Sequence, residues 1–81
     1  MNKNHVKKLE IFASIITVSS TRNMENDSSG AAISALFKDY GIPIKHYAIV
    51  PDQIDAIRNE LYTAMKTTNC IIFNGLSLIH I

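Results

Sequence analysis

Apolar and polar residues alternate along this chain in a pattern that predicts strands and helices in turn. The first apolar run, Ile11–Val18, is short and rich in β-branched residues, which is typical of a strand in the core. Ile44–Val50 and Asn69–Phe73 have the same character and predict two further strands. Apolar residues recur at helical spacing between these runs. The predicted order is therefore strand, helix, strand, helix, strand.

Each predicted helix has one apolar stripe that we expect to face a sheet. In the first helix the stripe comprises Ala32, Ile33, Leu36, Phe37 and Tyr40. In the second it comprises Ile54, Ile57, Leu61 and either Ala64 or Met65. Gly41 and Pro43 are expected to end the first helix, and Asp52 to cap the second. Strands that alternate with such helices predict an α/β fold, a three-layer sandwich with a mainly parallel sheet.

A parallel sheet gathers the loops that follow its strands along one edge. Here these loops are Ser19–Gly30, Pro51-Asp52 and Asn74-Gly75. Nucleotide-type ligands bind at this edge in open α/β sheets. We therefore expect one site, with Asp27 and Asp52 facing the same hollow.

Composition narrows the function classes. Eighty-one residues with 47% apolar content and net charge +1 predict one small domain and no nucleic-acid-binding surface. No apolar run approaches the roughly 20 residues of a membrane span, so no membrane partner is expected. The single cysteine, Cys70, lies in an apolar strand and is expected to be structural, which fits a reduced, cytoplasmic setting. Residues 1–8 are polar and are expected to form a loose arm.

The first loop carries most of the candidate chemistry. It offers hydroxyls, carboxylates and the free N–H groups of a helix start, which attract anions. Asp27, Ser28 or Ser29 can cap the helix, and a capping residue can also bind a ligand. Asp52 is equally open to two roles, a helix cap or a carboxylate that holds magnesium bound to phosphates. His46 has no second ligand at metal spacing and is expected to be structural.

Four segments, in this order and spacing, resemble the N-terminal half of the MoaB/Mog family of molybdenum-cofactor biosynthesis proteins. They are Ile15–Arg22, Asp27–Gly30, Ile49–Asp52 and Ile71–Gly75, so the resemblance covers residues 9–75. It implies a molybdopterin-binding domain whose complete protein adenylylates molybdopterin with magnesium-ATP and releases pyrophosphate. It also implies a homotrimer or hexamer.

The resemblance implies specific site residues. Asp52 would be catalytic and would help to place Mg²⁺ and the phosphates of ATP. The residues expected to bind the pterin and the nucleotide are Ser19, Ser20, Asp27, Ser28, Ser29, Gly30, Asn74 and Gly75.

The chain departs from the family pattern after Gly75. The family has a Gly-Gly-Thr-Gly loop there, followed by a further aspartate, whereas this chain continues with Leu76–Ile81. These six residues can be back-translated as CTG TCT CTT ATA CAC ATC, which is the mosaic end of a transposase used to fragment DNA for sequencing. We interpret residues 76–81 as a translated adapter, and we expect the fragment to be poorly stable, aggregation-prone and inactive.

Two alternatives remain open. The turn Ser19–Glu25 is placed like the phosphate-binding turn of flavodoxins, which would make the protein an FMN-binding electron carrier. Arg22 stands where that family has glycine, and this weakens the alternative. The second alternative is a non-catalytic pterin- or nucleotide-binding domain of a larger protein.

Overall fold

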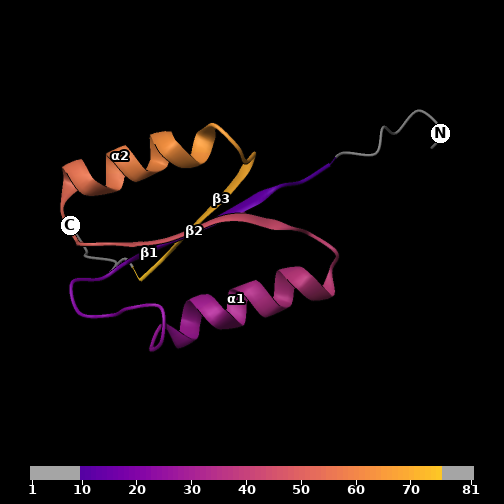
Figure 1. Ribbon diagram of the computed structural model, residues 1–81, viewed down its shortest axis with the longest axis horizontal. Helices are drawn as coiled ribbons and strands as arrows, with labels where there is room; N and C mark the ends of the chain where they lie inside the picture. The colour runs from indigo at the N-terminus through magenta and orange to yellow at the C-terminus, as the bar shows by residue number, and fades with distance from the viewer. Residues whose placement is uncertain (1–9, 76–81) are drawn as a thin grey trace, which may run out of the picture.

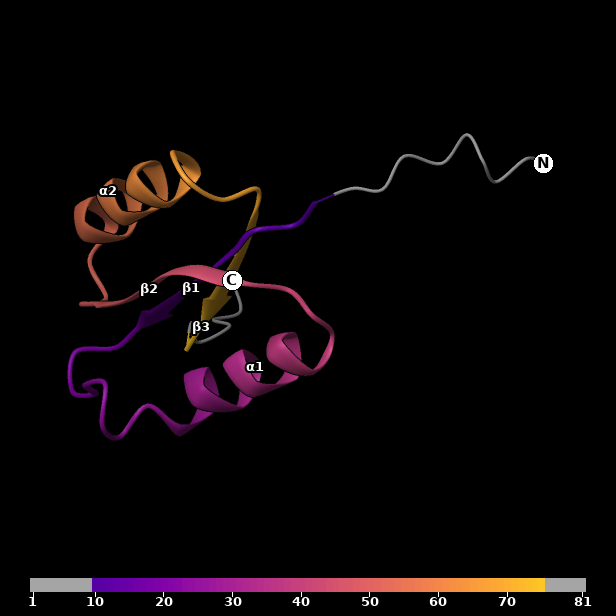
Figure 2. The same cartoon turned by 45° about the vertical axis from the view of Figure 1, so that its right-hand side comes forward.

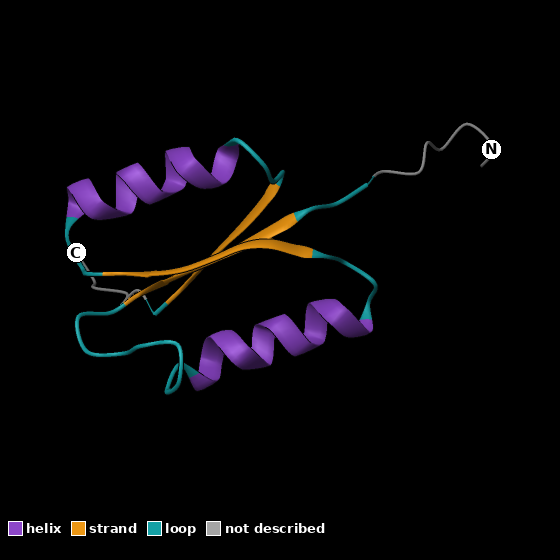
Figure 3. Ribbon diagram, viewed as in Figure 1, coloured by secondary structure: helices purple, strands orange, loops and turns teal. Residues whose placement is uncertain are grey.

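A computed structural model describes residues 10–75 and shows a three-stranded parallel sheet with a helix on either face (Figure 1). The elements are β1 (Ala13–Val18), α1 (Ser28–Asp39), β2 (Ile44–Val50), α2 (Ile54–Met65) and β3 (Cys70–Asn74). The predicted α/β class and the order of elements are confirmed, and Figure 3 shows the helix, sheet and helix layers. The expectations for residues 1–8 and 76–81 lie outside the described residues.

The order of the strands explains why the helices lie on opposite faces. The sheet has the order β2-β1-β3, with β1 in the centre and all six of its residues buried. The chain passes from β1 to β2 on one side and then crosses back over β1 to β3. Crossovers between parallel strands share one hand as a rule, so two crossovers in opposite directions place their helices on opposite faces. Figures 1 and 2 both show α1 and α2 on opposite faces of the sheet.

The larger apolar cluster lies between the sheet and α2. Its buried members are Ile16, Val18, Val50 and Ala64. Ala56 and Ile57 of α2 and Ile71 and Phe73 of β3 pack against them. Residues alternate between the two faces along a strand, so Ile15 and Thr17 point to the α1 side. The α2 side of β1 is mainly apolar, and its one buried hydroxyl, that of Ser14, bonds to the hydroxyl of Thr68 just after α2. On the α1 side, the buried hydroxyl of Thr17 lies beside Ile15.

Both ends of α1 are capped, by Asp27, one of the three predicted capping residues, and by the predicted Gly41. Asp27 occupies the N-cap position, and its side chain accepts a hydrogen bond from the Gly30 N–H. At the other end, Gly41 has a φ of +76° and its N–H bonds to the Lys38 carbonyl. The Ile42 N–H bonds to the Phe37 carbonyl, which completes a Schellman motif. These bonds satisfy groups that a helix end would otherwise leave without partners.

The predicted stripe of α1 is only partly correct. Ile33 and Phe37 are half-buried, but Ala32, Leu36 and Tyr40 are exposed, Tyr40 by 74%. The least exposed face of α1 comprises Gly30, Ile33, Ser34 and Phe37. The helix is turned because Gly30, which has no side chain, lies against the sheet. In α2, Ala64 is buried and Ile57 and Leu61 are half-buried as predicted, whereas Ile54 and Met65 are exposed.

Three strand boundaries differ from the prediction, and Asn69 explains two of them, the starts of β1 and β3. Its side-chain oxygen accepts from the Phe12 N–H at 2.9 Å, and its side-chain nitrogen donates to the Glu10 carbonyl at 2.9 Å. Asn69, just before β3, is thus hydrogen-bonded to the segment that precedes β1. Regular pairing of the two strands begins only at Ala13 and Cys70. β3 then extends to Asn74, which pairs with Thr17.

Candidate ligand-binding site

The carboxyl ends of the three strands meet at one edge of the sheet, as the parallel pairing requires. The loop after β1 leads to α1, the turn after β2 leads to α2, and β3 ends at Asn74 and Gly75. The direction of the chain across the sheet reverses, since it runs from β1 outward to β2 and then back past β1 to β3. In open α/β sheets, ligands bind in the crevice at such a reversal.

Asp27 is a buried carboxylate at this edge, with a relative exposure of 2%. Its Oδ2 accepts short hydrogen bonds of 2.6 Å from the hydroxyl of Thr17 on β1 and of 2.6 Å from the phenol of Tyr47 on β2. Its Oδ1 accepts from the Gly30 N–H at 3.2 Å. The Asn74 side-chain nitrogen on β3 lies 3.5 Å from the same oxygen. One carboxylate thus joins all three strands to the start of α1.

The hydrogen-bond donors around Asp27 keep it ionised. Burial by itself raises the pKa of this carboxyl. The hydrogen bonds from Thr17, Tyr47 and Gly30, together with the positive charge of Arg22, outweigh burial and lower the pKa below its ordinary value of 3.8. Asp27 is therefore a fixed negative charge at neutral pH.

Tyr47 and Thr17 belong to this cluster, although the sequence singled out neither of them as a site residue. Burial, the hydrogen bond to Asp27 and the negative charge of Asp27 raise the pKa of Tyr47 to about 12, so its phenol remains a donor. Strand alternation places Tyr47 and Thr17 on the same side of the sheet, which was the available signal. Sequence could not indicate which loop residue would reach both hydroxyls.

The first part of the loop is held by its own side chains. Ser19 Oγ accepts from the backbone N–H groups of Thr21 at 3.2 Å and Arg22 at 3.0 Å. The Asn23 N–H donates to the Asn26 side chain at 2.7 Å, and Asn23 accepts in turn from the Glu25 and Asn26 N–H groups. These bonds fix the backbone of the loop and bring Arg22 Nη1 to 3.7 Å from Asp27 Oδ1.

Two glycines allow the elements to approach closely. A Cβ on Gly30 would lie 2.1 Å from the Tyr47 hydroxyl oxygen and 2.2 Å from Asp27 Oδ2. Gly75 has a φ of +93°, and a Cβ there would lie 2.7 Å from the Val18 carbonyl oxygen. Both positions were predicted site residues, and in the structure both are positions of close approach.

Asp52 does not cap α2, contrary to one of its two predicted roles. α2 begins at Ile54, and Gln53 occupies the N-cap position without a side-chain hydrogen bond to the helix. The reason is a tight turn in which the Gln53 N–H bonds to the Pro51 carbonyl at 2.7 Å, which separates Asp52 from the helix by one residue. Asp52 is exposed and makes no hydrogen bond or ion pair with any described residue.

Of the remaining predicted site residues, one contacts the Asp27 cluster and three are exposed beside it. Asn74 contacts the Asp27 cluster and also donates to the Thr17 hydroxyl at 3.1 Å. Ser20, Ser28 and Ser29 are exposed at the same edge. Asp27 precedes α1 and Asp52 lies in the turn before α2, and these two helices cover opposite faces of the sheet. No interaction among the described residues joins the two aspartates. A hollow shared by these two carboxylates therefore stays a prediction.

The two other residues weighed for chemistry lie away from this edge. His46 Nε2 lies 2.6 Å from Glu60 Oε2 and so joins β2 to α2, and Cys70 is half-buried at the start of β3. Within residues 10–75, no group of three or more His, Cys, Asp or Glu side chains could hold a metal ion. No helix of the described part of the chain is long and apolar enough to cross a membrane.

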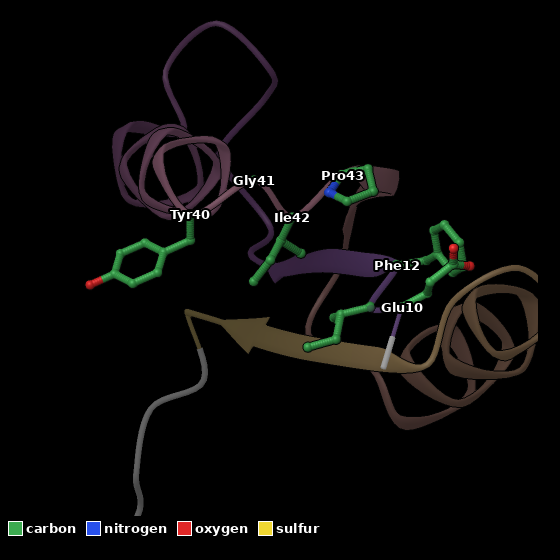
Figure 4. Close-up of a pocket in the computed structure, with 7 residues that line it drawn as sticks. Glu10, Phe12, Tyr40, Gly41, Ile42 and Pro43 are labelled. Carbon is green, nitrogen blue, oxygen red and sulfur yellow. The ribbon is translucent and has the colours of Figure 1, made fainter. Parts of the chain in front are cut away.

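A cavity of about 640 Å³ lies at the opposite end of the strands (Figure 4). Its lining comes from the segment before β1 and from the turn after α1, and comprises Glu10, Ile11, Phe12, Tyr40, Gly41, Ile42 and Pro43. Among the described residues that line it, Glu10 and the exposed Tyr40 are the only ionisable ones. The polar cluster at the carboxyl ends is therefore the better candidate for chemistry.

The fold and the cluster define a class: an α/β protein whose candidate ligand loops follow the strands of a parallel sheet. The family model described as "Probable molybdopterin binding domain" matches residues 14–76. The chain belongs to this family of molybdopterin-binding domains, and the MoaB/Mog resemblance is confirmed.

Two curated relatives are similar to the chain, and both are called molybdenum cofactor biosynthesis protein B. The protein from Staphylococcus epidermidis is 36% identical over 61 residues, which is 73% of this chain and 35% of the relative. The protein from Bacillus subtilis is 33% identical over 63 residues, which is 75% of this chain and 37% of the relative. The chain thus spans little more than a third of these relatives. No solved structure matches it.

Proposed function

We propose that this chain is the part of a molybdenum-cofactor biosynthesis protein that binds molybdopterin, and that the complete protein adenylylates molybdopterin with magnesium-ATP. The observation that carries the proposal is the ionised, buried Asp27 at the carboxyl ends of the strands, bonded to all three of them in a chain of the molybdopterin-binding family. A fixed negative charge can accept hydrogen bonds from the N–H groups of a polar heterocycle, and the loop N–H and hydroxyl groups can donate to a phosphate.

In this proposal the loop residues line the pocket for the pterin and the nucleotide. Ser20, Ser28 and Ser29 offer exposed hydroxyls. Asn74 offers the oxygen of its side-chain amide, since its nitrogen bonds to Thr17. Ser19 acts mainly on its own loop, since its hydroxyl already accepts two backbone bonds. At Gly30 and Gly75, the absence of a side chain lets neighbouring elements pack closely around the pocket.

Asp52 is proposed as the catalytic carboxylate that helps to hold Mg²⁺. Its carboxylate is exposed and is not used for capping, so it is free to bind a metal ion. Mg²⁺ is commonly held by one or two carboxylates together with substrate phosphates, so a single aspartate fits this chemistry. When bound, the ion would neutralise charge on the phosphates of ATP. Assembly as a trimer or hexamer belongs to the same proposal.

Pterin binding is tested on the 81-residue chain by anaerobic titration with molybdopterin, followed by pterin fluorescence. We expect binding by the wild-type chain and, to within a few fold, by the matched control Asp39→Asn, which removes an exposed carboxylate at the other end of α1. Asp27→Asn is expected to lose binding. A folded chain that binds FMN and not molybdopterin would contradict the proposal and support the flavodoxin-like alternative.

Catalysis is tested in a chimera in which residues 10–75 replace the matched segment of the Bacillus subtilis relative. We expect the chimera to release pyrophosphate from ATP only when molybdopterin is present, and the 81-residue chain to release none. Asp52→Asn should lower the rate of the chimera at least about a hundredfold, because electrostatic stabilisation of the phosphates is lost. A chimera that binds molybdopterin but is inactive would favour the non-catalytic alternative.

A further inference from the structure

The two oxygens of Asp27 are used differently. Oδ2 accepts both short bonds, from Thr17 and from Tyr47, each 2.6 Å long. Oδ1 has only longer contacts, at 3.2 Å to the Gly30 N–H and 3.5 Å to the Asn74 nitrogen, besides Arg22 Nη1 at 3.7 Å. The carboxylate is therefore fixed through one oxygen and directs its charge at Arg22 through the other.

The contact with Asp27 orients Arg22 but leaves its hydrogen-bond donors available to a ligand. At 3.7 Å the pair is electrostatic and longer than a hydrogen bond. A guanidinium has five N–H donors in a rigid fork, and the side chain of Arg22 is 39% exposed. The loop backbone beneath it is fixed by Ser19. Arg22 thus keeps donors that face solvent, while the buried negative charge of Asp27 fixes its position.

Arg22 is also distinctive in its location. The cations of residues 10–75 are Arg22, Lys38, Lys45, Arg58 and Lys66. Lys38 and Lys66 lie at the far ends of α1 and α2, and Lys45 lies at the start of β2. Arg58 lies within α2, 3.9 Å from Asp55. Within the described residues, Arg22 is therefore the one cation in the loops at the carboxyl ends of the strands.

We propose that Arg22 binds the phosphate group of the ligand, and that Asp27, itself fixed by Thr17 and Tyr47, is the positioning residue for this arginine. The inference rests on the proposed function, since it presupposes a phosphate-bearing ligand at these loops. The guanidinium fork matches two phosphate oxygens, which an ammonium group cannot do. The phosphate can be that of the pterin or that of the nucleotide.

The first test is calorimetric titration of the 81-residue chain, and of the chimera described above, with inorganic pyrophosphate at constant ionic strength. Arg22→Gln should weaken binding by about ten- to a hundredfold, because charge-assisted hydrogen bonds are lost. Arg22→Lys should restore only part of it. The matched control Arg58→Gln should bind like the wild type. Equal affinity of Arg22→Gln and wild type in the folded chimera would overturn the proposal.

The sign of the Asp27→Asn effect tests the positioning role. If Asp27 only neutralised Arg22, removal of its charge would tighten pyrophosphate binding. If it positions Arg22, Asp27→Asn should weaken binding, and Tyr47→Phe, which keeps the charge, should weaken it by a few fold. Tighter binding in both variants would overturn the positioning role, and Tyr47→Phe decides the matter if Asp27→Asn fails to fold.

Parallel titrations separate this proposal from the proposed function and identify the source of the phosphate. AMP and ATP probe the nucleotide phosphates, molybdopterin its own phosphate, and 6-hydroxymethylpterin a pterin without phosphate. Arg22-dependent binding of pyrophosphate without binding of either pterin would support the role of Arg22 and contradict the proposed function. Binding of molybdopterin that is the same in wild type and Arg22→Gln, with no binding of pyrophosphate, AMP or ATP, would overturn the role of Arg22 alone.

Discussion

At the scale of single residues, Asp27 shows how a buried charge can be retained. An unpaired carboxylate in the interior is strongly unfavourable, because its hydration is lost. Here Thr17, Tyr47 and Gly30 donate to it, and Arg22 supplies a positive charge beside it. Such a group stabilises the fold only while every donor stays in place.

Asp27→Asn is expected to destabilise the chain by about 2–4 kcal/mol at neutral pH, because an amide cannot accept from all these donors. The folded pKa of Asp27 lies below 3.8. Its contribution to stability is therefore present above that value and is lost as the pH falls through it toward the lower folded pKa. Thermal unfolding between neutral pH and about pH 3 should show a steeper acid loss in wild type than in the variant. Equal slopes would contradict the ionised Asp27.

Tyr47→Phe is expected to cost about 1.5–3 kcal/mol, the value of a hydrogen bond to a charged group. The folded pKa of Tyr47 is raised from 10.0 to about 12, so the stability gained from the neutral phenol is present below pH 10.0 and lost as the pH rises toward 12. Tyrosinate absorbance should show a late titration step that Tyr47→Phe removes. Tyr62→Phe, at an exposed position of α2, is the control and should retain that step.

At the scale of elements, the start of α1 packs closely against the sheet because Gly30 has no side chain. Gly30 lies in the first turn of α1 and is buried, and its neighbours in space are Tyr47 and Asp27. The face that α1 turns to the sheet therefore begins at Gly30 and continues through Ile33 and Phe37. Leu36 and Tyr40 consequently lie away from the sheet.

Gly30→Ala tests this close fit. Alanine favours helices in general, but here its Cβ would lie 2.1 Å from the Tyr47 oxygen, so the Tyr47–Asp27 hydrogen bond must shift. We expect a loss of about 1–3 kcal/mol in urea unfolding, the usual cost of an overpacked core. Ser29→Ala, the exposed neighbour, should be nearly neutral. A stabilised Gly30→Ala would refute the packing of α1 described here.

At the scale of the whole molecule, the sheet is small and open. β2 and β3 are both edge strands, and unpaired edges promote association. Several large apolar side chains are exposed by more than half: Met24, Leu36, Tyr40, Ile54, Tyr62 and Met65. A chain of this size buries a modest fraction of its surface, so its stability is expected to be marginal.

The 81-residue chain is therefore expected to self-associate as its concentration rises, which sedimentation velocity measures directly. Leu36→Lys should reduce association without loss of helical circular dichroism, because it replaces an exposed apolar side chain with a charged one. Ala35→Lys, at the next exposed position of α1, is the control and should have a smaller effect. A strictly monomeric wild-type chain would contradict this expectation.

Much of the molecule follows from local patterns in the sequence. β2 begins and ends where the apolar run predicts, Asp27 caps α1, and Gly41 closes the same helix. These features depend on residues within a few positions of one another. The boundaries of β1 and β3 could not be predicted, because Asn69 joins segments that are 59 residues apart in the sequence.

The sequence by itself determined the alternation of strands and helices, the parallel sheet and the loops that carry candidate chemistry, since hydrophobic period and turn residues act locally. Only the tertiary structure decided which side chains meet. It placed Tyr47 and Thr17 on Asp27, turned α1 about Gly30, and left Asp52 exposed outside its helix. The physical reason is that hydrogen bonds between different elements depend on how a helix is rotated against a sheet, and close packing at a single glycine fixes that rotation.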